Sequence, residues 1–290
     1  MPASCRRYVK RAAEDEANEG ELALGQFQDH FQDKVVLITG ASMGVGAGLA
    51  QTFAAQGAKV AIAARSVDKL ESLAKSLPGE SLVIAADMSQ PDQVRDMVAQ
   101  TVARFGRIDI LVNNAAVGMY AAASDMDMTA CEHLIKTNWL GPIHAIQAAV
   151  PVMRRQGGGQ IINISTVAAR LPLPYFTAYA STKYAMTAMS DILRMELRPD
   201  NIQVLLVFLG RVRTNFTVNA FKGPGTKALG GKMGGISVER AARAILLAAR
   251  WKRREIVVPC SNRVFGWLRR LAPPVIDRLA LALLKPMMRK

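Results

Sequence analysis

The stretch LITGASMGVGAG, residues 37–48, ends an apolar run and opens a glycine-rich turn. Its glycines Gly40, Gly44 and Gly46 follow the pattern G-x-x-x-G-x-G, between the apolar residues 34–39 and a helix-length segment. Glycines at such a turn let the backbone approach a pyrophosphate, whose charge the N-terminus of the following helix stabilises. Because the pattern follows a buried strand, the stretch predicts the first strand–turn–helix unit of a nucleotide-binding α/β fold.

The remainder of the chain repeats the alternation of short apolar runs and longer helical patterns. Six further runs are typical of buried strands, at residues 59–64, 81–86, 108–114, 160–165, 201–208 and 255–259. A helical pattern between two of them, residues 91–106, begins with proline and ends with glycine, as helices do. Continuous apolar strands alternating with helices predict an α/β fold, a single doubly wound Rossmann-like domain with a seven-stranded parallel sheet.

We expect three segments in the chain. Residues 1–32 are predicted to be a polar extension, because the acidic run AAEDEANEGE stands where a secretory signal would be apolar. Residues 33–260 form the Rossmann-fold domain, and residues 261–290 a basic, apolar tail. Within the domain, the glycine-rich residues 215–236 are predicted to be an active-site lid without a packed element, with disorder as the alternative.

Composition is that of an ordinary soluble protein, with 50% hydrophobic and 21% charged residues. Three scattered cysteines and three histidines offer no spacing for a disulfide framework or a metal site, so we expect no metal. No apolar run reaches the roughly 18 to 20 residues that span a membrane. These features favour a reducing, cytoplasmic location.

The net charge of +14 is concentrated at the C-terminus, where residues 251–290 hold ten Lys and Arg against two acids. Such a tail is typical of nucleic-acid binding, of a membrane surface or acidic partner, or of a solvated basic face. Because no nucleic-acid reader fold is present, we expect no nucleic acid as partner. The short apolar helix expected at 275–284 suits peripheral binding at the inner membrane surface, or packing against the lid or a partner subunit.

The stretch AYASTKYAM, residues 178–186, places a tyrosine four residues before a lysine. On a helix Tyr179 and Lys183 would lie on one face, and an ammonium beside a phenol lowers the pKa of the phenol. The pair is either a tuned acid/base or a surface pair, and its spacing alone does not decide between them.

The motifs taken together resemble the short-chain dehydrogenase/reductase family, from about residue 34 to residue 259. Their order and spacing make the resemblance specific, although each motif is modest by itself. The matching residues are Thr39, Gly40, Gly44 and Gly46 for its T-G-x-x-x-G-x-G motif, Asn113, Asn114, Ala115 and Ala116 for its N-N-A-G motif, Asn138 for its helix asparagine, and Tyr179 and Lys183 for its Y-x-x-x-K motif.

Three positions depart from the family pattern. Ala116 replaces a glycine, which the backbone tolerates if its φ is not positive. The catalytic serine of the family stands thirteen residues before the tyrosine, where this chain has Thr166, so we assign Thr166 with Ser165 as the alternative. The family's P-G after the sixth strand is Leu209-Gly210 here.

The resemblance implies a set of catalytic roles. Tyr179 would be the general acid/base, and its pKa would be lowered by Lys183 and by the positive nicotinamide of the oxidised cofactor. Lys183 would also bind the nicotinamide ribose. Thr166, or Ser165, would orient the substrate oxygen. Asn138 would support a water chain that feeds protons to Lys183. We place Tyr175, one turn before Tyr179, at the substrate mouth, so the expected substrate-binding residues are Thr166, Tyr175 and Tyr179.

The end of the second strand indicates which cofactor is used. Ala64 stands where an NAD enzyme usually has an Asp for the ribose 2′-OH, and Arg65 offers a guanidinium suited to a 2′-phosphate. We therefore expect NADP(H), with NAD(H) as the alternative, although Met43 replaces a basic residue of many NADP enzymes. Asp87 is an adenine contact or a helix N-cap. The expected cofactor-binding residues are Gly40, Ser42, Met43, Gly44, Val45, Gly46, Arg65, Ser66, Asp87, Met88, Asn114, Ala115, Ala116, Tyr179, Lys183, Gly210, Val212 and Thr214.

The predicted function is hydride transfer between NADP(H) and a carbonyl compound or secondary alcohol. Residues 169–176, with Phe216, Phe221 and Met233 in the lid, indicate a lipophilic substrate. The alternatives are an epimerase or dehydratase and a non-catalytic nucleotide-binding protein on the same fold. We expect a homodimer or homotetramer.

Overall fold

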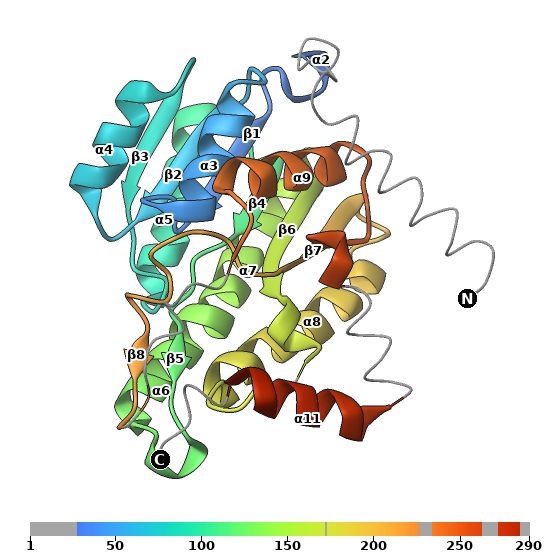
Figure 1. Cartoon of the computed structure of the whole chain (residues 1–290). Helices are drawn as coiled ribbons and strands as arrows, with labels where there is room; N and C mark the ends of the chain where they lie inside the picture. The colour runs from blue at the N-terminus through green and yellow to red at the C-terminus, as the bar shows by residue number, and fades with distance from the viewer. Residues whose placement is uncertain (1–27, 172, 225, 227–233, 263–271, 285–290) are drawn as a thin grey trace, which may run out of the picture.

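The computed structural model describes residues 28–171, 173–224, 226, 234–262 and 272–284. Its centre is a seven-stranded, fully parallel sheet in the order β3-β2-β1-β4-β6-β7-β9 (Figure 1). The strands are β1 (Val35–Thr39), β2 (Lys59–Ala64), β3 (Ser81–Ala85), β4 (Ile110–Asn113), β6 (Gly159–Thr166), β7 (Ile202–Leu209) and β9 (Glu255–Val258). The predicted sheet is confirmed. Its strand order reverses between β1 and β4, and ligands of such sheets bind at the carboxyl ends of the strands beside that reversal.

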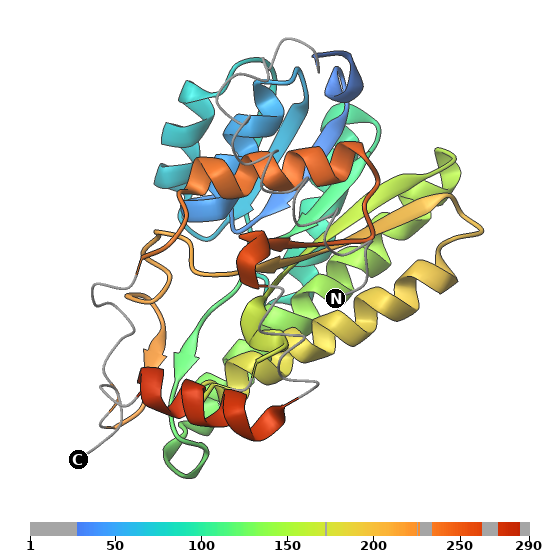
Figure 2. The same ribbon diagram turned by 45° about the vertical axis from the view of Figure 1, so that its right-hand side comes forward.

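Helices cover both faces of the sheet (Figure 2). The face that contains Val36 and Ile38 packs on α3, α4 and α9, and the face that contains Leu37 packs on α5, α7 and α8. Consecutive strand residues point to opposite faces, so a strand that is covered on both sides is apolar throughout. These helices are α3 (Gly44–Ala54), α4 (Val67–Ser76), α5 (Pro91–Phe105), α7 (Gly141–Arg155), α8 (Thr177–Glu196) and α9 (Val238–Arg250).

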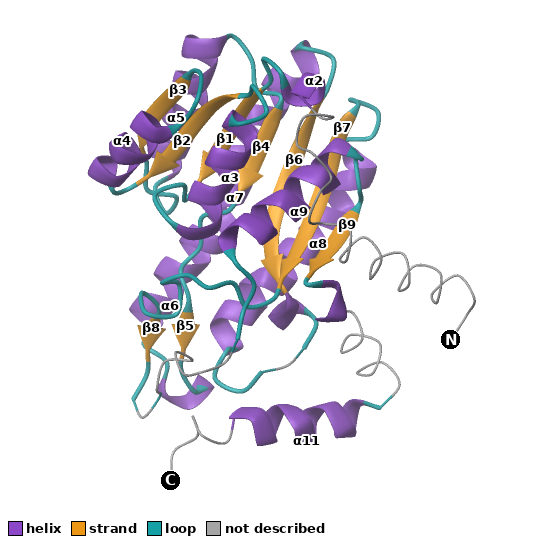
Figure 3. Ribbon diagram, turned by 45° about the horizontal axis from the view of Figure 1, so that its top comes forward, coloured by secondary structure: helices purple, strands orange, loops and turns teal. Residues whose placement is uncertain are grey.

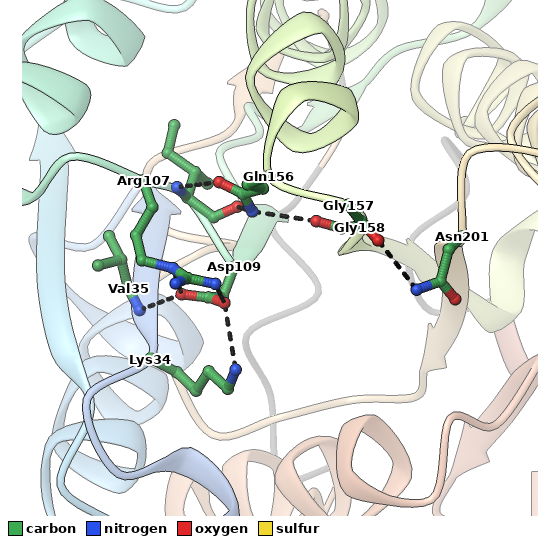
Figure 4. A network of polar contacts seen from close by, with 9 residues as sticks. Lys34, Val35, Arg107, Asp109, Gln156, Gly157, Gly158 and Asn201 are labelled. Atoms are coloured by element: carbon green, nitrogen blue, oxygen red, sulfur yellow. Dashed lines mark hydrogen bonds and ion pairs between the residues drawn. The ribbon is translucent and has the colours of Figure 1, made fainter.

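A network of hydrogen bonds connects the amino ends of the central strands (Figure 4). The Asp109 carboxylate accepts a hydrogen bond of 2.9 Å from the Val35 backbone N–H and two from the Arg107 guanidinium, at 2.9 and 2.7 Å. Gln156 donates to the carbonyls of Ile108 and Gly158, at 2.6 and 3.0 Å. Because these bonds join the starts of β1, β4 and β6, the carboxyl ends of the strands are left for a binding site.

Short elements gather at the carboxyl end of the sheet (Figure 3). The strands β5 (Met119–Tyr120) and β8 (Phe221–Lys222) pair in parallel, so the expectation that the lid holds no packed element is wrong. A strand of two residues leaves no alternating pattern in a sequence. The remaining elements are α2 (Gln28–Phe31), α6 (Met128–Ile135), a π-helix (Lys136–Leu140), α11 (Pro273–Leu284) and the 3-10 turns Ala123–Asp125, Val167–Ala169 and Cys260–Asn262.

The two ends of the chain are described only in part. Residues 1–27 of the expected polar extension, residues 225 and 227–233 of the expected lid, and residues 263–271 and 285–290 of the tail lie outside the described residues. The helix expected in the tail is present as α11, at the same end of the molecule as β5 and β8 (Figures 1 and 2). Among the described residues, none of the helices has both the length and the apolar character to cross a bilayer.

Candidate active site

A cavity of about 950 Å³ opens at the carboxyl ends of the central strands. All but one of the residues expected to bind the cofactor line it, and the exception is Gly46. Those lining residues are Gly40, Ser42, Met43, Gly44, Val45, Arg65, Ser66, Asp87, Met88, Asn114, Ala115, Ala116, Tyr179, Lys183, Gly210, Val212 and Thr214. Segments far apart in the sequence therefore meet around a single space.

The glycine turn between β1 and α3 needs its glycines for two different reasons. Gly40 and Gly44 have φ values of +66° and +58°, in the left-handed region that other residues rarely adopt. Gly46 permits close packing instead, because a Cβ there would lie 2.4 Å from the Gly40 carbonyl oxygen and 2.6 Å from Asn114 Nδ2. The same Asn114 Nδ2 donates to the carbonyls of Thr39 and Gly40, which fixes the turn against β4.

The helix that follows this turn begins without a polar cap. Met43 at the N-cap makes no side-chain hydrogen bond, and the first turn of α3 contains no acidic residue. The first backbone N–H groups of a helix have no partner within it and favour an anion. The start of α3 therefore suits a phosphate.

Asp87 holds the turn after β3. Its Oδ1 accepts hydrogen bonds of 2.8 Å from the N–H and from the hydroxyl of Ser89, whereas the N-cap of α5 is Gln90. Burial acts to raise the pKa of this carboxyl, but the bonds from Ser89 and the nearby Arg65 guanidinium bring the pKa below its usual value. Asp87 is therefore not the helix N-cap, and it lines the cavity beside Arg65.

The Tyr179 and Thr166 side chains meet in the cavity. Tyr179 projects from the first turn of α8 and is 9% exposed. Thr166 ends β6, donates a 3.2 Å hydrogen bond to the Leu209 carbonyl, and lies near enough to the phenol to lower its pKa. The Ser165 hydroxyl donates to the backbone carbonyl of Lys183, at 3.2 Å. Neighbouring strand residues point in opposite directions, so the hydroxyl beside Tyr179 belongs to Thr166 and not to Ser165.

Lys183 is not among the groups that lower the pKa of Tyr179 in this structure. Burial, together with the neighbouring Tyr120, raises the pKa of the phenol, and the nearby Thr166 hydroxyl opposes that rise only in part. The Lys183 ammonium donates to the Ile164 carbonyl at 2.8 Å, and burial lowers its own pKa to about 8. Desolvation therefore dominates the ionisation of both groups.

Asn138 is a structural bridge in this geometry. Its amide accepts from the Val117 N–H and donates to the Val117 carbonyl, both at 2.8 Å, with a longer contact of 3.4 Å to the Thr182 hydroxyl. The side chain is fully buried and does not line the cavity. It therefore joins the π-helix to the segment after β4, and the water chain to Lys183 stays a prediction.

The residue beside it, Thr137, was not expected from the sequence. Its hydroxyl is buried, has no hydrogen-bond partner in the structure, and belongs to a residue that lines the cavity. A π-helix changes which side chains face a given direction, so the usual helical spacing could not have indicated it.

Aromatic rings form the wall of the cavity around Tyr179. Phe216 lies 5.6 Å and Phe176 6.3 Å from Tyr179 between ring centroids, and Tyr120 lies 4.9 Å from Phe176. Phe176 lines the cavity, whereas the expected Tyr175, which has a φ of +70° just before α8 begins, does not. Of the lid residues expected here, Phe216 lines the cavity, Phe221 does not, and Met233 lies outside the described residues.

A doubly wound sheet with a glycine turn beside its topological switch point, and a tyrosine, a threonine and a lysine in the adjoining cavity, defines a nucleotide-dependent α/β enzyme. Residues 34–225 match the family described as short chain dehydrogenase. The chain belongs to the short-chain dehydrogenase/reductase family and is an oxidoreductase.

Relatives and solved structures agree with this assignment. The chain is 35% identical over 260 residues to a dehydrogenase/reductase SDR family protein 7-like of Anopheles gambiae, covering 85% of this chain and 81% of that protein. It matches a short-chain dehydrogenase from Streptomyces avermitilis with a TM-score of 0.76 at 28% identity, covering 88% and 97% of the two chains. A metagenomic short-chain oxidoreductase in complex with NADP matches with a TM-score of 0.66 at 28% identity, covering 78% and 97%.

Proposed function

We propose that this oxidoreductase uses NADP(H) to reduce the carbonyl group of a lipophilic small molecule, or to oxidise the corresponding secondary alcohol. The observation that carries the proposal is the meeting of the Tyr179 and Thr166 side chains inside an aromatic-walled cavity. The glycine turn and Arg65 line the same cavity, so one space has room for a dinucleotide and a substrate.

The residues present fit a nicotinamide dinucleotide. The buried Thr137 hydroxyl lacks a partner that a bound group would supply, and the start of α3 offers N–H groups to a pyrophosphate. Gly40, Gly44, Asn114 and Thr214 would hold the dinucleotide along the turn. When bound, the nicotinamide supplies or accepts the hydride.

The preference for NADP(H) rests on the end of β2. Ala64 is buried and carries no carboxylate that would repel a 2′-phosphate. The exposed Arg65 stands next to it and lines the cavity, where its guanidinium would pair with that phosphate. The metagenomic oxidoreductase that resembles this chain was solved in complex with NADP, which agrees with this assignment.

The chain's own residues account for the proton chemistry. The raised pKa keeps the Tyr179 phenol protonated, ready to donate to a carbonyl oxygen as that oxygen gains negative charge. The Thr166 hydroxyl, which donates to the Leu209 carbonyl in this structure, would turn to donate a second hydrogen bond to the same oxygen and fix its position. Lys183, one helical turn further along α8, lines the same cavity and would bind the nicotinamide ribose. Residues 215–224 contain the wall residue Phe216, pair with β5 through Phe221 and Lys222, and would form a lid over the cavity.

A single substitution tests the mechanism. Tyr179→Phe removes only the hydroxyl, so NADPH oxidation with a panel of apolar ketones should fall by about a thousandfold. NADPH affinity, measured by titration of its fluorescence, should stay within about threefold because the ring still fills its place. Tyr184→Phe, an exposed tyrosine on the same helix, is the matched control and should keep full turnover. Reduction by Tyr179→Phe at the rate of the unmodified enzyme would exclude the mechanism.

A further inference from the structure

Tyr120 places a second phenol in the cavity that contains Tyr179. It lies on the two-residue strand β5, lines the cavity and is 3% exposed. Its ring packs edge-on against Phe176, with 4.9 Å between the centroids, and both residues belong to the apolar cluster that includes Tyr179 and Phe216. These contacts place Tyr120 in the substrate half of the cavity, the part around Tyr179 and the aromatic wall.

The backbone of Tyr120 is fixed from two sides. Its carbonyl accepts hydrogen bonds from the Gly223 N–H at 2.8 Å and from the Thr226 hydroxyl at 3.0 Å. The next residue, Ala121, donates to the Tyr175 carbonyl at 2.9 Å. The strand β5 is therefore joined both to the segment after β8 and to the segment before α8. The phenol is positioned before a ligand binds, which lowers the entropic cost of binding.

The hydroxyl of Tyr120 is left without a partner by this packing. Within the described part of the chain, no group forms a hydrogen bond with it, whereas the Thr166 hydroxyl donates to the Leu209 carbonyl. Burial raises the pKa of Tyr120 to about 12, so the phenol is protonated and uncharged at neutral pH. A buried hydroxyl that lacks a partner costs free energy, and a bound molecule with a suitable oxygen would remove that cost.

We infer that the Tyr120 hydroxyl binds a second, uncharged oxygen of the substrate, so the enzyme favours apolar carbonyl compounds with an ether, hydroxyl or carbonyl oxygen elsewhere in the chain. This inference rests on the proposed function and narrows the substrate class of the same cavity. Tyr179 and Thr166 serve the oxygen that reacts, which leaves the Tyr120 phenol for another one. The aromatic rings pack on the rest of the chain.

The test uses ketones of equal length in which oxygen replaces a single CH2 group. The reference is 2-decanone, and the ethers 1-hexyloxy-2-propanone, 4-pentyloxy-2-butanone and 5-butoxy-2-pentanone move the oxygen along the chain one position at a time. Tyr120→Phe removes only the hydroxyl and keeps the ring contact with Phe176. Tyr184→Phe, at an exposed position of α8, is the matched control. The readouts are kcat and KM for each ketone and the dissociation constant of NADPH.

We expect Tyr120→Phe to lower the ratio of kcat/KM for at least one ether to that for 2-decanone by about 5- to 30-fold. The intrinsic reactivity of each ketone cancels when this ratio is compared between the two proteins. The loss should appear in KM, with kcat within about twofold, because the bond is made equally in the bound substrate and the transition state. The position of the affected ether then gives the separation of the two substrate oxygens.

The controls should leave these ratios unchanged. Tyr184→Phe should match the unmodified enzyme with every ketone, and NADPH affinity should stay within about threefold in both variants. The inference would be overturned by unchanged ratios for all three ethers, by a loss confined to kcat or equal for every ketone, or by a loss of NADPH affinity in Tyr120→Phe.

A binding measurement separates this inference from the proposed function. If the enzyme reduces none of the four ketones, the reductase proposal fails, and their affinities are measured by calorimetric titration in the presence of saturating NADP+. Tyr120→Phe should then weaken the binding of one ether relative to 2-decanone by about 5- to 30-fold. Equal changes for the ethers and 2-decanone, or no binding of any ketone, would reject the Tyr120 hydroxyl as a binding group.

Discussion

The two halves of the cavity are built in different ways. The nucleotide half is made of backbone: long parallel strands end there, Gly40 and Gly44 turn the chain, and Gly46 lets α3 pack closely. The substrate half is made of side chains, and some of them lie on short elements, such as Tyr120 on the two-residue strand β5 and Thr137 on the π-helix. A backbone site tolerates few residue types, whereas a side-chain site can change its chemistry with one substitution. The following substitutions test that difference.

The largest effect should come from filling the glycine turn. Gly46→Val places a branched side chain where a single Cβ would already meet the Gly40 carbonyl oxygen at 2.4 Å. The turn must shift, so we expect NADPH affinity to fall by at least about a hundredfold, or about 2.7 kcal/mol. Overpacking should also lower the free energy of unfolding by about 1 to 3 kcal/mol.

The matched control for this change is Gly234→Ala, where an added Cβ would meet nothing within 4 Å. Both variants are measured by NADPH fluorescence titration and by urea unfolding. If Gly46→Val bound NADPH as tightly as Gly234→Ala does, the close approach at the turn would not be what forms the nucleotide half.

The substrate half should respond to the removal of one hydroxyl. Thr166→Ala removes the hydroxyl that acts on Tyr179. We expect kcat to fall by the factor that corresponds to a loss of about 2 to 4 kcal/mol of transition-state stabilisation. Ser165→Ala removes only a bond to the Lys183 carbonyl, so it should cost about 1 kcal/mol of stability and leave kcat within about threefold. Steady-state kinetics of both variants check this, and the reverse ranking would give the role to Ser165.

The same contrast explains what the sequence could predict. All seven strands of the main sheet and the glycine turn were predicted, because buried strands and left-handed glycines restrict which residue types can occur. The choice of Thr166 over Ser165 followed from the family that the chain resembles, whose catalytic serine stands thirteen residues before the tyrosine, and the structure places Thr166 near Tyr179. The strands, the glycine turn and the position of Thr166 can be predicted because each is determined by residues that are close together in the sequence.

Features that depend on tertiary packing were not predictable in this way. The sequence indicated that Lys183 would lower the pKa of Tyr179, but it could not show that the ammonium is directed at the Ile164 carbonyl. Thr137 lines the cavity from a π-helix, and Phe176 lines it where Tyr175 was expected. Each of these features depends on the direction in which a side chain points, and the pattern of apolar and polar residues in a sequence does not indicate that direction.

Lys183 lies between the two halves, and its burial should make the free energy of unfolding depend on pH. Burial lowers its pKa to about 8, below the unfolded value of 10.5. Below pH 8 the ammonium is charged in both states and its burial costs stability. Between pH 8 and 10.5 the unfolded chain binds the additional proton, so stability rises with pH by up to about 3 kcal/mol.

The measurement compares the unmodified protein with Lys183→Met in urea at several pH values from 7 to about 10.5. Other titrating groups contribute equally to both proteins and cancel in the difference. The stability of the unmodified protein should therefore rise relative to the variant as pH increases. A difference that stays constant would mean that the lysine is not buried as a charged group.

The smallest effect is expected at the rim of the nucleotide half. Arg65 is exposed, so solvent screens its charge, and Arg65→Gln should weaken NADPH binding by about tenfold while leaving NADH binding unchanged. Ala64→Asp adds a carboxylate at the neighbouring position and should weaken NADPH while strengthening NADH, through the ribose hydroxyl. Neither change touches the aromatic wall, so kcat with saturating cofactor should be preserved. If both variants lost affinity for NADPH and for NADH equally, the end of β2 would bind the nucleotide but would not recognise the 2′-phosphate that distinguishes NADPH from NADH.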